Sequence, residues 1–179
     1  MIRHDERMTW TATKPPAPAP EPLVGAERAI LESFLAWQRY TLLTICAGLT
    51  ADQLARRPVP SSNLSLLGLI RHLAKVERTW FRERVGGERF DPMYDPEMGK
   101  DADFNDLQPA LAESDFARFA EECRLADATA ANRSFDDTFD YRDETYSLRL
   151  VYVHMNTEYA RHNGHADLLR EAIDGITGS

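Results

Sequence analysis

Apolar residues recur at helical spacing in four segments of the chain, and β-type alternation does not compete with this pattern. The first segment runs from about Gly25 to Ala47, and the second lies between the breaker at residues 58–63 and the stop at Gly86 and Gly87. The third begins near Ser114, and the fourth runs from about residue 147 to residue 175. Four such helices predict an all-α domain that folds as a four-helix bundle.

The first three predicted helices each carry a row of mostly apolar residues on one face. The rows are Ile30, Phe34, Trp37 and Thr41; Leu69, His72, Val76 and Trp80; and Phe116, Phe119, Cys123, Ala126 and Ala130. Ser62, Asn63 or Ser65 is expected to cap the second helix.

The remaining segments are expected to be irregular. Residues 1–24 contain the Pro-rich run from Lys14 to Pro22, which predicts an extended or disordered tail before a domain at residues 25–179. The long acidic loop from Gly86 to Glu113 joins the second and third helices, and loops of this length are usually functional or disordered. Residues 134–146 are expected to form a turn or short hairpin, and they lack the spacing and glycine of an EF-hand calcium site.

A polar cluster interrupts the apolar stripe of the fourth helix. The stripe has spacings of three and four residues and consists of Val151, Met155, Glu158, His162, His165 and Leu169. At about 100° per residue these positions share one face, which is expected to point inward, with His154 just beside it. A buried carboxylate needs a compensating partner, and a Glu and a His one turn apart can bind one metal ion.

His72 lies on the expected inward face of the second helix and provides a complementary ligand. Two helices then supply one Glu and two His and leave positions open for water or substrate, as in catalytic metal sites. Two alternatives remain at this point. His72 could be a core histidine with a hydrogen-bond partner, and Glu158 and His162 could be an exposed ion pair, although that requires an outward-facing stripe.

Bulk composition narrows the function classes. The chain of 179 residues is 43% hydrophobic and 28% charged, which is typical of a soluble globular domain. A net charge of -8 argues against nucleic acid as a partner. The apolar runs are far shorter than the roughly 20 residues of a membrane helix, and residues 1–22 lack the apolar core of a signal peptide. No membrane partner and a cytoplasmic location are therefore expected.

Neither cysteine is expected to be the nucleophile. Cys46 lies near the end of the first helix and Cys123 on the apolar row of the third, positions typical of buried cysteines. The sequence has no Cys-x-x-Cys motif and no Gly-x-Ser-x-Gly motif.

Two motifs resemble those of a known family. The run SLLGLIRHLAKVERTW at residues 65–80 resembles the metal-bearing helix of the DinB-like superfamily. The closing segment resembles its last helix through His154, Glu158, RHNGH at residues 161–165 and LLRE at residues 168–171. The Glu at position 158, where most members have His, is similar to the actinobacterial branch of mycothiol-dependent maleylpyruvate isomerases and mycothiol S-transferases.

The resemblance implies a bundle, often a homodimer, in which His72, Glu158 and His162 bind a divalent metal. Zinc is the first expectation, with nickel, iron or manganese as others, and mycothiol is the expected thiol cosubstrate for a small electrophilic molecule. His165 could be a fourth ligand, could orient a ligand or could contact substrate, and either His165 or His154 could move protons.

Further residues are assigned more broadly. Trp80 is expected in the core or in the lining of a cofactor pocket, and Glu77 in an ion pair at the surface or between helices. Arg149 and Arg170 are expected to pair with acids or to contact a polar cofactor.

Several functions use the same ligands. Metal-bound hydroxide would make the protein a hydrolase that needs no thiol. Tight binding without turnover would make it a metal-binding or ligand-binding stress protein, and two His with one carboxylate also suit a non-haem iron site.

Overall fold

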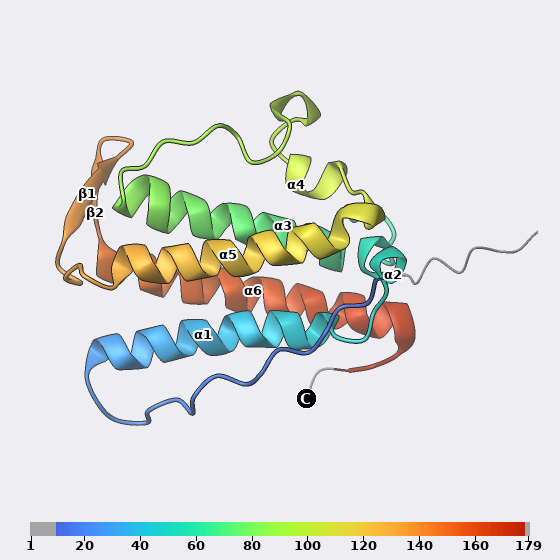
Figure 1. The fold of residues 1–179 in the computed structure, drawn as a ribbon, viewed down its shortest axis with the longest axis horizontal. Coiled ribbons are helices and arrows are strands. Elements are labelled where there is room, and N and C mark those ends of the chain that lie inside the picture. Colours follow the sequence, from blue (N-terminus) through green and yellow to red (C-terminus); the bar gives the residue numbers. More distant parts are fainter. Residues whose placement is uncertain (1–9, 178–179) are drawn as a thin grey trace, which may run out of the picture.

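The computed structural model describes residues 10–177, and helices dominate them (Figure 1). Four long helices lie side by side: α1 (Glu27–Cys46), α3 (Leu66–Glu77), α5 (Ala112–Ala130) and α6 (Leu148–Asp174). Helix α3 continues directly into a π-helix, η1 (Arg78–Val85). Helix α1 packs on α6, and α3 packs on both α5 and α6. The prediction of an all-α domain is confirmed.

Short elements fill the connections between the long helices. Helix α2 (Ala51–Ala55) follows α1, and the long loop holds η2 (Pro96–Met98), α4 (Ala102–Asn105) and η3 (Pro109–Leu111). Strands β1 (Thr138–Tyr141) and β2 (Glu144–Ser147) form an antiparallel hairpin in which Thr138 pairs with Ser147. Its turn residues Arg142 and Asp143 have φ of 53° and 62°, as a two-residue turn between twisted strands requires. The hairpin is the second of the two forms expected for residues 134–146.

Side-chain caps fix where the two helices of the site begin. The hydroxyl of Ser65 accepts a hydrogen bond from Gly68 N at 3.0 Å, so Ser65 is the cap among the three candidates. The hydroxyl of Ser147 accepts one from Leu150 N at 3.2 Å and starts α6. Gly175, with φ of 79°, ends α6 in the left-handed conformation that favours glycine.

The core face of α1 differs from the row of residues identified in the sequence. Leu35, Leu42 and Cys46 are buried, whereas Phe34 is 45% exposed. The row with Phe34 and Trp37 faces the N-terminal segment instead, since Trp37 Nε1 donates a hydrogen bond to the carbonyl of Ala19. Both faces of α1 are partly apolar, so periodicity alone does not show which one meets α6.

Part of the segment expected to be an extended or disordered tail is packed on the helices. Ala12 is buried, and it pairs with the α1–α2 connection through hydrogen bonds with Gly48 and Leu49. The ring of Trp10 packs on Phe116 with centroids 5.0 Å apart. Residues 1–9 of the expected tail lie outside the described residues. The apolar contacts of Trp10 and Ala12 explain why this part of the segment is held in place.

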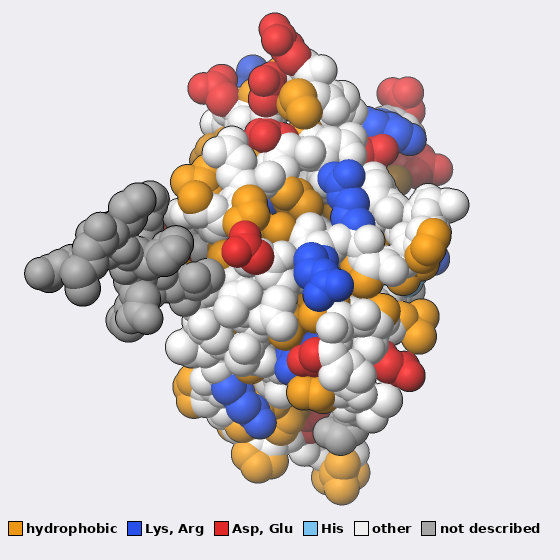
Figure 2. All heavy atoms as spheres, turned by 90° about the vertical axis from the view of Figure 1, so that its right-hand side faces the viewer, with side chains coloured by type: hydrophobic (Ala, Val, Ile, Leu, Met, Phe, Trp, Pro, Cys, Tyr) orange, Lys and Arg blue, Asp and Glu red, His pale blue; other side chains and the backbone are white. Residues whose placement is uncertain are grey.

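The surface is mixed in character. Figure 2 views the molecule from the end where α2 lies and shows acidic side chains gathered at the top, over the segment that carries η2. Hydrophobic side chains are scattered over this face between charged ones. None of the described helices combines the length and the apolarity that crossing a membrane requires.

Candidate metal centre

Three predicted ligands converge between α3 and α6. His72 Nε2 and His162 Nε2 each lie 3.2 Å from the same oxygen of Glu158, Oε1. One ligand atom from each residue lies within 4.8 Å of the other two. The inward stripe of α6 explains this placement, because Val151, Met155 and Leu169 are buried on either side of the pair. The structure therefore brings together the three residues that the sequence analysis selected.

The donor set suits a divalent cation. Two imidazole nitrogens and one carboxylate oxygen are the ligands that zinc and similar ions take in catalytic sites. Hydrogen bonds from His162 and then from His72 lower the pKa of Glu158, so the carboxylate is ionised at neutral pH. Among residues 10–177 no Lys or Arg pairs with Glu158. A metal ion would supply the positive charge that the side chains around this carboxylate do not.

Asp103 orients His72 from the long loop. Its carboxylate is 1% exposed, and Oδ2 accepts a hydrogen bond from His72 Nδ1 at 2.8 Å. When an ion is bound, a neutral His72 would keep its proton on Nδ1 and present the lone pair of Nε2 to that ion. Lys75 Nζ also contacts Asp103 Oδ2 at 2.6 Å. In the absence of metal, burial lowers the pKa of His72, but the bonds to Asp103 and Glu158 outweigh burial and raise it overall.

Two further contacts hold α4 and therefore Asp103 in place. Arg71 Nε donates to the carbonyl of Asp103 at 3.0 Å. Phe104 packs against α3 at Gly68, where a Cβ atom would lie only 2.7 Å from Phe104 Cδ1. The sequence analysis expected a loop of this length to be functional or disordered, but no spacing pointed to Asp103.

The other two histidines of α6 flank the three ligands. His165 Nδ1 lies 3.4 Å from His162 Nδ1, and burial, followed by the neighbouring His162, lowers the pKa of His165. His154 packs on Trp80 with ring centroids 4.4 Å apart, and burial lowers its pKa as well. Both rings are therefore neutral near pH 7, and neither belongs to the converging group of three.

The two arginines singled out in the sequence lie in ion pairs and backbone contacts. Arg149 is bonded to Glu27 and Asp136, and it lies nine residues before Glu158, about 180° around the helix. Arg170 donates to the carbonyls of Ile45 and Ala47 and pairs with Asp174. The structure thus favours the acid-pairing alternative for both, and Arg149 does not lie at the metal centre.

A comparison with protein-family models identifies the chain's relatives. The model described as mycothiol-S-transferase matches residues 30–175. The chain belongs to the mycothiol-S-transferase family. This finding confirms the resemblance noted in the sequence and indicates a mycothiol-related transferase. Searches of curated proteins and of solved structures gave no match.

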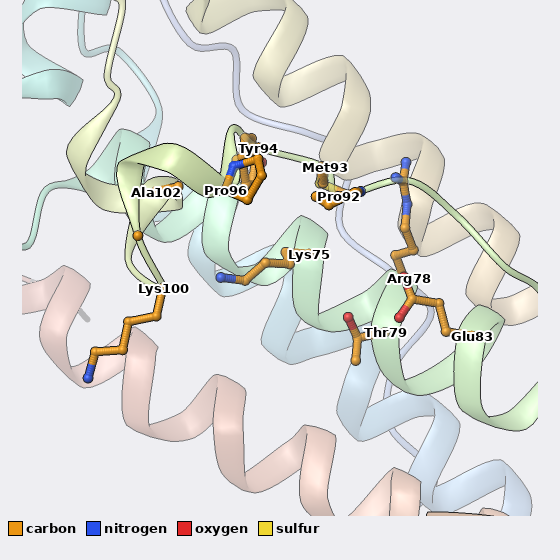
Figure 3. A pocket seen from close by; sticks show the side chains of 11 residues that line it. Lys75, Arg78, Thr79, Glu83, Pro92, Met93, Tyr94, Pro96, Lys100 and Ala102 are labelled. Atoms are coloured by element: carbon orange, nitrogen blue, oxygen red, sulfur yellow. The ribbon is translucent and has the colours of Figure 1, made fainter.

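One pocket of this mycothiol-S-transferase family member includes Lys75, the residue that contacts Asp103. It has a volume of about 260 Å³ and lies between α3, η1 and the long loop. Figure 3 shows Lys75 and Thr79 on the helix, with Pro92, Met93 and Pro96 of the loop above them. Lys75 connects the pocket to the ligands, because its amine also bonds to Asp103. A pocket with an apolar wall and a few polar groups suits a small molecule.

Neither cysteine offers a thiolate. Cys46 is buried, and burial raises the pKa of its thiol to about 12. Burial, and next the nearby Glu77, raise the pKa of Cys123 well above its ordinary value. Neither thiol of this chain is therefore readily ionised near neutral pH.

Proposed function

We propose that this protein transfers mycothiol to a small electrophile at a divalent metal ion held by His72, Glu158 and His162. The observation that carries the proposal is the convergence of two imidazole Nε2 atoms on one carboxylate oxygen, each at 3.2 Å. Family membership supports the thiol. Zinc is the proposed ion, with nickel, iron and manganese as alternatives for the same ligands.

The bound ion would lower the pKa of the mycothiol sulfur and so supply a thiolate near neutral pH. Three protein ligands leave room for the thiol. The side chains of His72 and Glu158 are 19% and 22% exposed, so the thiol can approach from the surface between α3 and α6. The sulfur then forms a bond to the electrophilic carbon, and the leaving group departs with its electron pair.

Asp103 and His165 hold the two imidazoles in the orientation that the site needs. Asp103 keeps the proton of His72 on Nδ1. His162 presents Nε2 to the centre, so its Nδ1 carries the hydrogen and donates it to His165 Nδ1. The nitrogen of a neutral His165 that accepts this bond cannot also accept the thiol proton. His165 is therefore a positioning residue.

His154 is the better proton acceptor. Its pKa is lowered, so the ring is neutral and can accept the thiol proton near pH 7. It precedes Glu158 by one turn of α6, a rise of about 6 Å. Trp80 packs on its face and fixes the ring without using a nitrogen. In the proposed reaction, the thiol proton moves to His154 as the sulfur attacks the electrophilic carbon.

The test compares mycothiol with no added thiol, using a small chromogenic electrophile and zinc-loaded protein. We expect turnover only with mycothiol, and a loss of at least about 100-fold in His72→Ala, since a ligand is removed. Arg149→Gln is the matched control, because Arg149 lies on the opposite face of α6, and it should retain wild-type activity. Product formation at the same rate without thiol would overturn the proposal in favour of hydrolysis, and metal binding without turnover would reduce it to a binding protein.

A further inference from the structure

Arg84, on the π-helix η1, is a cation that lacks an acidic partner. Its guanidinium carbon lies 3.8 Å from the ring centroid of Trp80 and 3.9 Å from that of Tyr141. Two neighbours on η1 differ: Arg78 pairs with Glu122, and Arg82 pairs with Glu88 and Glu122. Within residues 10–177, no Asp or Glu lies within ion-pair distance of Arg84. Burial, the largest influence on its pKa, lowers that pKa, because the charge has lost water without gaining a counter-ion.

Side-chain contacts link Arg84 to the candidate metal ligands. Trp80, which stacks on Arg84, also packs on His154 with ring centroids 4.4 Å apart. His154 in turn lies close enough to both Glu158 and Arg84 for each charge to act on its pKa, Glu158 raising it and Arg84 lowering it. A molecule that reaches from the proposed sulfur to Arg84 therefore passes along the rings of His154 and Trp80.

The π-helix places Arg84 on this side of the chain. In a regular α-helix Arg84 would lie twelve residues, or about 120° in net rotation, from His72. The backbone of η1 instead bonds five residues apart, as from Gly86 N to the carbonyl of Phe81 at 2.8 Å. A π-turn holds more residues, so each one rotates by less, and Arg84 turns back toward the face of His72. Such irregular turns are frequent at functional sites.

We propose that Arg84 binds the carboxylate of the electrophilic substrate, and that the preferred substrates are small planar electrophiles carrying a negative charge. The rings of Trp80 and Tyr141 lie against the guanidinium, and the Tyr141 side chain also hydrogen-bonds with it. A guanidinium carries five N–H donors, so the donors that Tyr141 does not use can bind a carboxylate in bidentate fashion. Trp80 and His154 provide flat surfaces for the planar part. Mycothiol is a neutral sugar conjugate without carboxylate or phosphate, so the anionic group belongs to the electrophile. The inference rests on the proposed thiol transfer.

A matched pair of electrophiles tests this inference: 4-chloro-3,5-dinitrobenzoate and its uncharged amide. In both, the mycothiol sulfur bonds to the ring carbon, chloride leaves with its electron pair, and the thiol proton is taken up by the base. The quantity measured is the ratio of kcat/KM for the benzoate to that for the amide at saturating mycothiol. This ratio cancels effects on the thiol and on the chemical step.

We expect Arg84→Gln to lower this ratio on the order of 30-fold, because a bidentate charged contact is lost. Arg84→Lys keeps the charge but cannot form the bidentate contact, so its kcat/KM ratio should lie between those of wild type and Arg84→Gln. Arg142→Gln is the matched control. It removes the same charge from the same region, where Arg142 is exposed and lies 5.1 Å from the Tyr141 ring, and it should leave the ratio unchanged.

Equilibrium binding separates this inference from the proposed function. Calorimetry with unreactive 3,5-dinitrobenzoate and 3,5-dinitrobenzamide, without thiol, should show tighter binding of the benzoate to wild type and no preference in Arg84→Gln. If neither electrophile turns over but this preference holds, thiol transfer fails and anion binding at Arg84 stands. Three results would overturn the inference. They are an unchanged kcat/KM ratio in Arg84→Gln, no preference of the wild type for the benzoate, and a raised KM of Arg84→Gln for mycothiol with both electrophiles. Arg84→Lys keeps the test valid if Arg84→Gln does not fold.

Discussion

Two polar clusters lie five residues apart on α3, and their partners differ. Glu77 is fully buried, and Arg39 binds it in bidentate fashion, with Nε at 2.7 Å from Oε1 and Nη2 at 2.8 Å from Oε2. Tyr159 donates a further hydrogen bond to Glu77 at 2.7 Å. At His72, by contrast, two imidazoles face a carboxylate, Glu158, that has no Lys or Arg partner among the described residues.

We infer from this difference that the Glu77 cluster stabilises the fold and that the Glu158 cluster binds a ligand. A carboxylate removed from water needs a cation and hydrogen bonds. Around Glu77 the chain supplies both, so that cluster is complete. Around Glu158 the described residues supply two imidazoles and no Lys or Arg, and we propose that a cation from outside completes that cluster.

The largest expected effect comes from removing Arg39, the cationic partner of Glu77. Arg39→Met leaves the Glu77 charge buried without its partner and should lower the free energy of unfolding by about 3–5 kcal/mol. Urea denaturation of metal-free protein measures this change. Glu158→Gln, at the incomplete cluster, is the control and should change the same quantity by less than about 1 kcal/mol. Equal losses in the two variants would remove the distinction between the clusters.

A smaller effect is expected at the residue that orients His72. Asp103→Asn should weaken metal binding about 10–100-fold while leaving the three ligands in place. Competition with a chelating dye measures the affinity. Asp91→Asn, an exposed acid in the same loop, should bind metal as wild type does. Wild-type affinity in Asp103→Asn would contradict the assigned role.

The smallest effect concerns the cysteines, one of which lies at the complete cluster. Cys123 Sγ is 3.7 Å from Glu77 Oε1, and both thiols have raised pKa values. Iodoacetamide at pH 8.5 should therefore modify neither in the native protein, as mass spectrometry would show.

The raised pKa of Cys46 also predicts how stability depends on pH. Cys46 stays protonated in the folded state from its ordinary pKa of 9.0 up to about 12, whereas the unfolded thiol ionises across this range. The free energy of unfolding should thus lose its Cys46 contribution as the pH rises above 9. A Cys46→Ala variant should show a shallower decline, and an identical slope would contradict the shift.

Local pattern was sufficient for part of the structure. The four helices followed from spacing, and so did the stripe that places Glu158 and His162 on one face. The pairing of α3 with α6 was needed to bring His72 to them, and a family resemblance suggested it. Asp103 reaches His72 from 31 residues away through the packing of Phe104 at Gly68, which no local pattern encodes.

Arg84 was missed for a related reason. Its position depends on a π-helix, and apolar spacing read at about 100° per residue places it on another face. The sequence pointed instead to Arg149, which ion pairs hold elsewhere. The homodimer expected from the resemblance stays a prediction.

Metal content is the most direct test of the central claim. Elemental mass spectrometry of tag-free protein should find about one divalent ion per chain, as a site with three ligands requires. His72→Ala, Glu158→Ala and His162→Ala should each lose the ion, whereas His165→Ala should retain it. Two results would contradict the account. One is stoichiometric metal in the His162→Ala variant, and the other is wild-type protein that takes up neither zinc nor nickel.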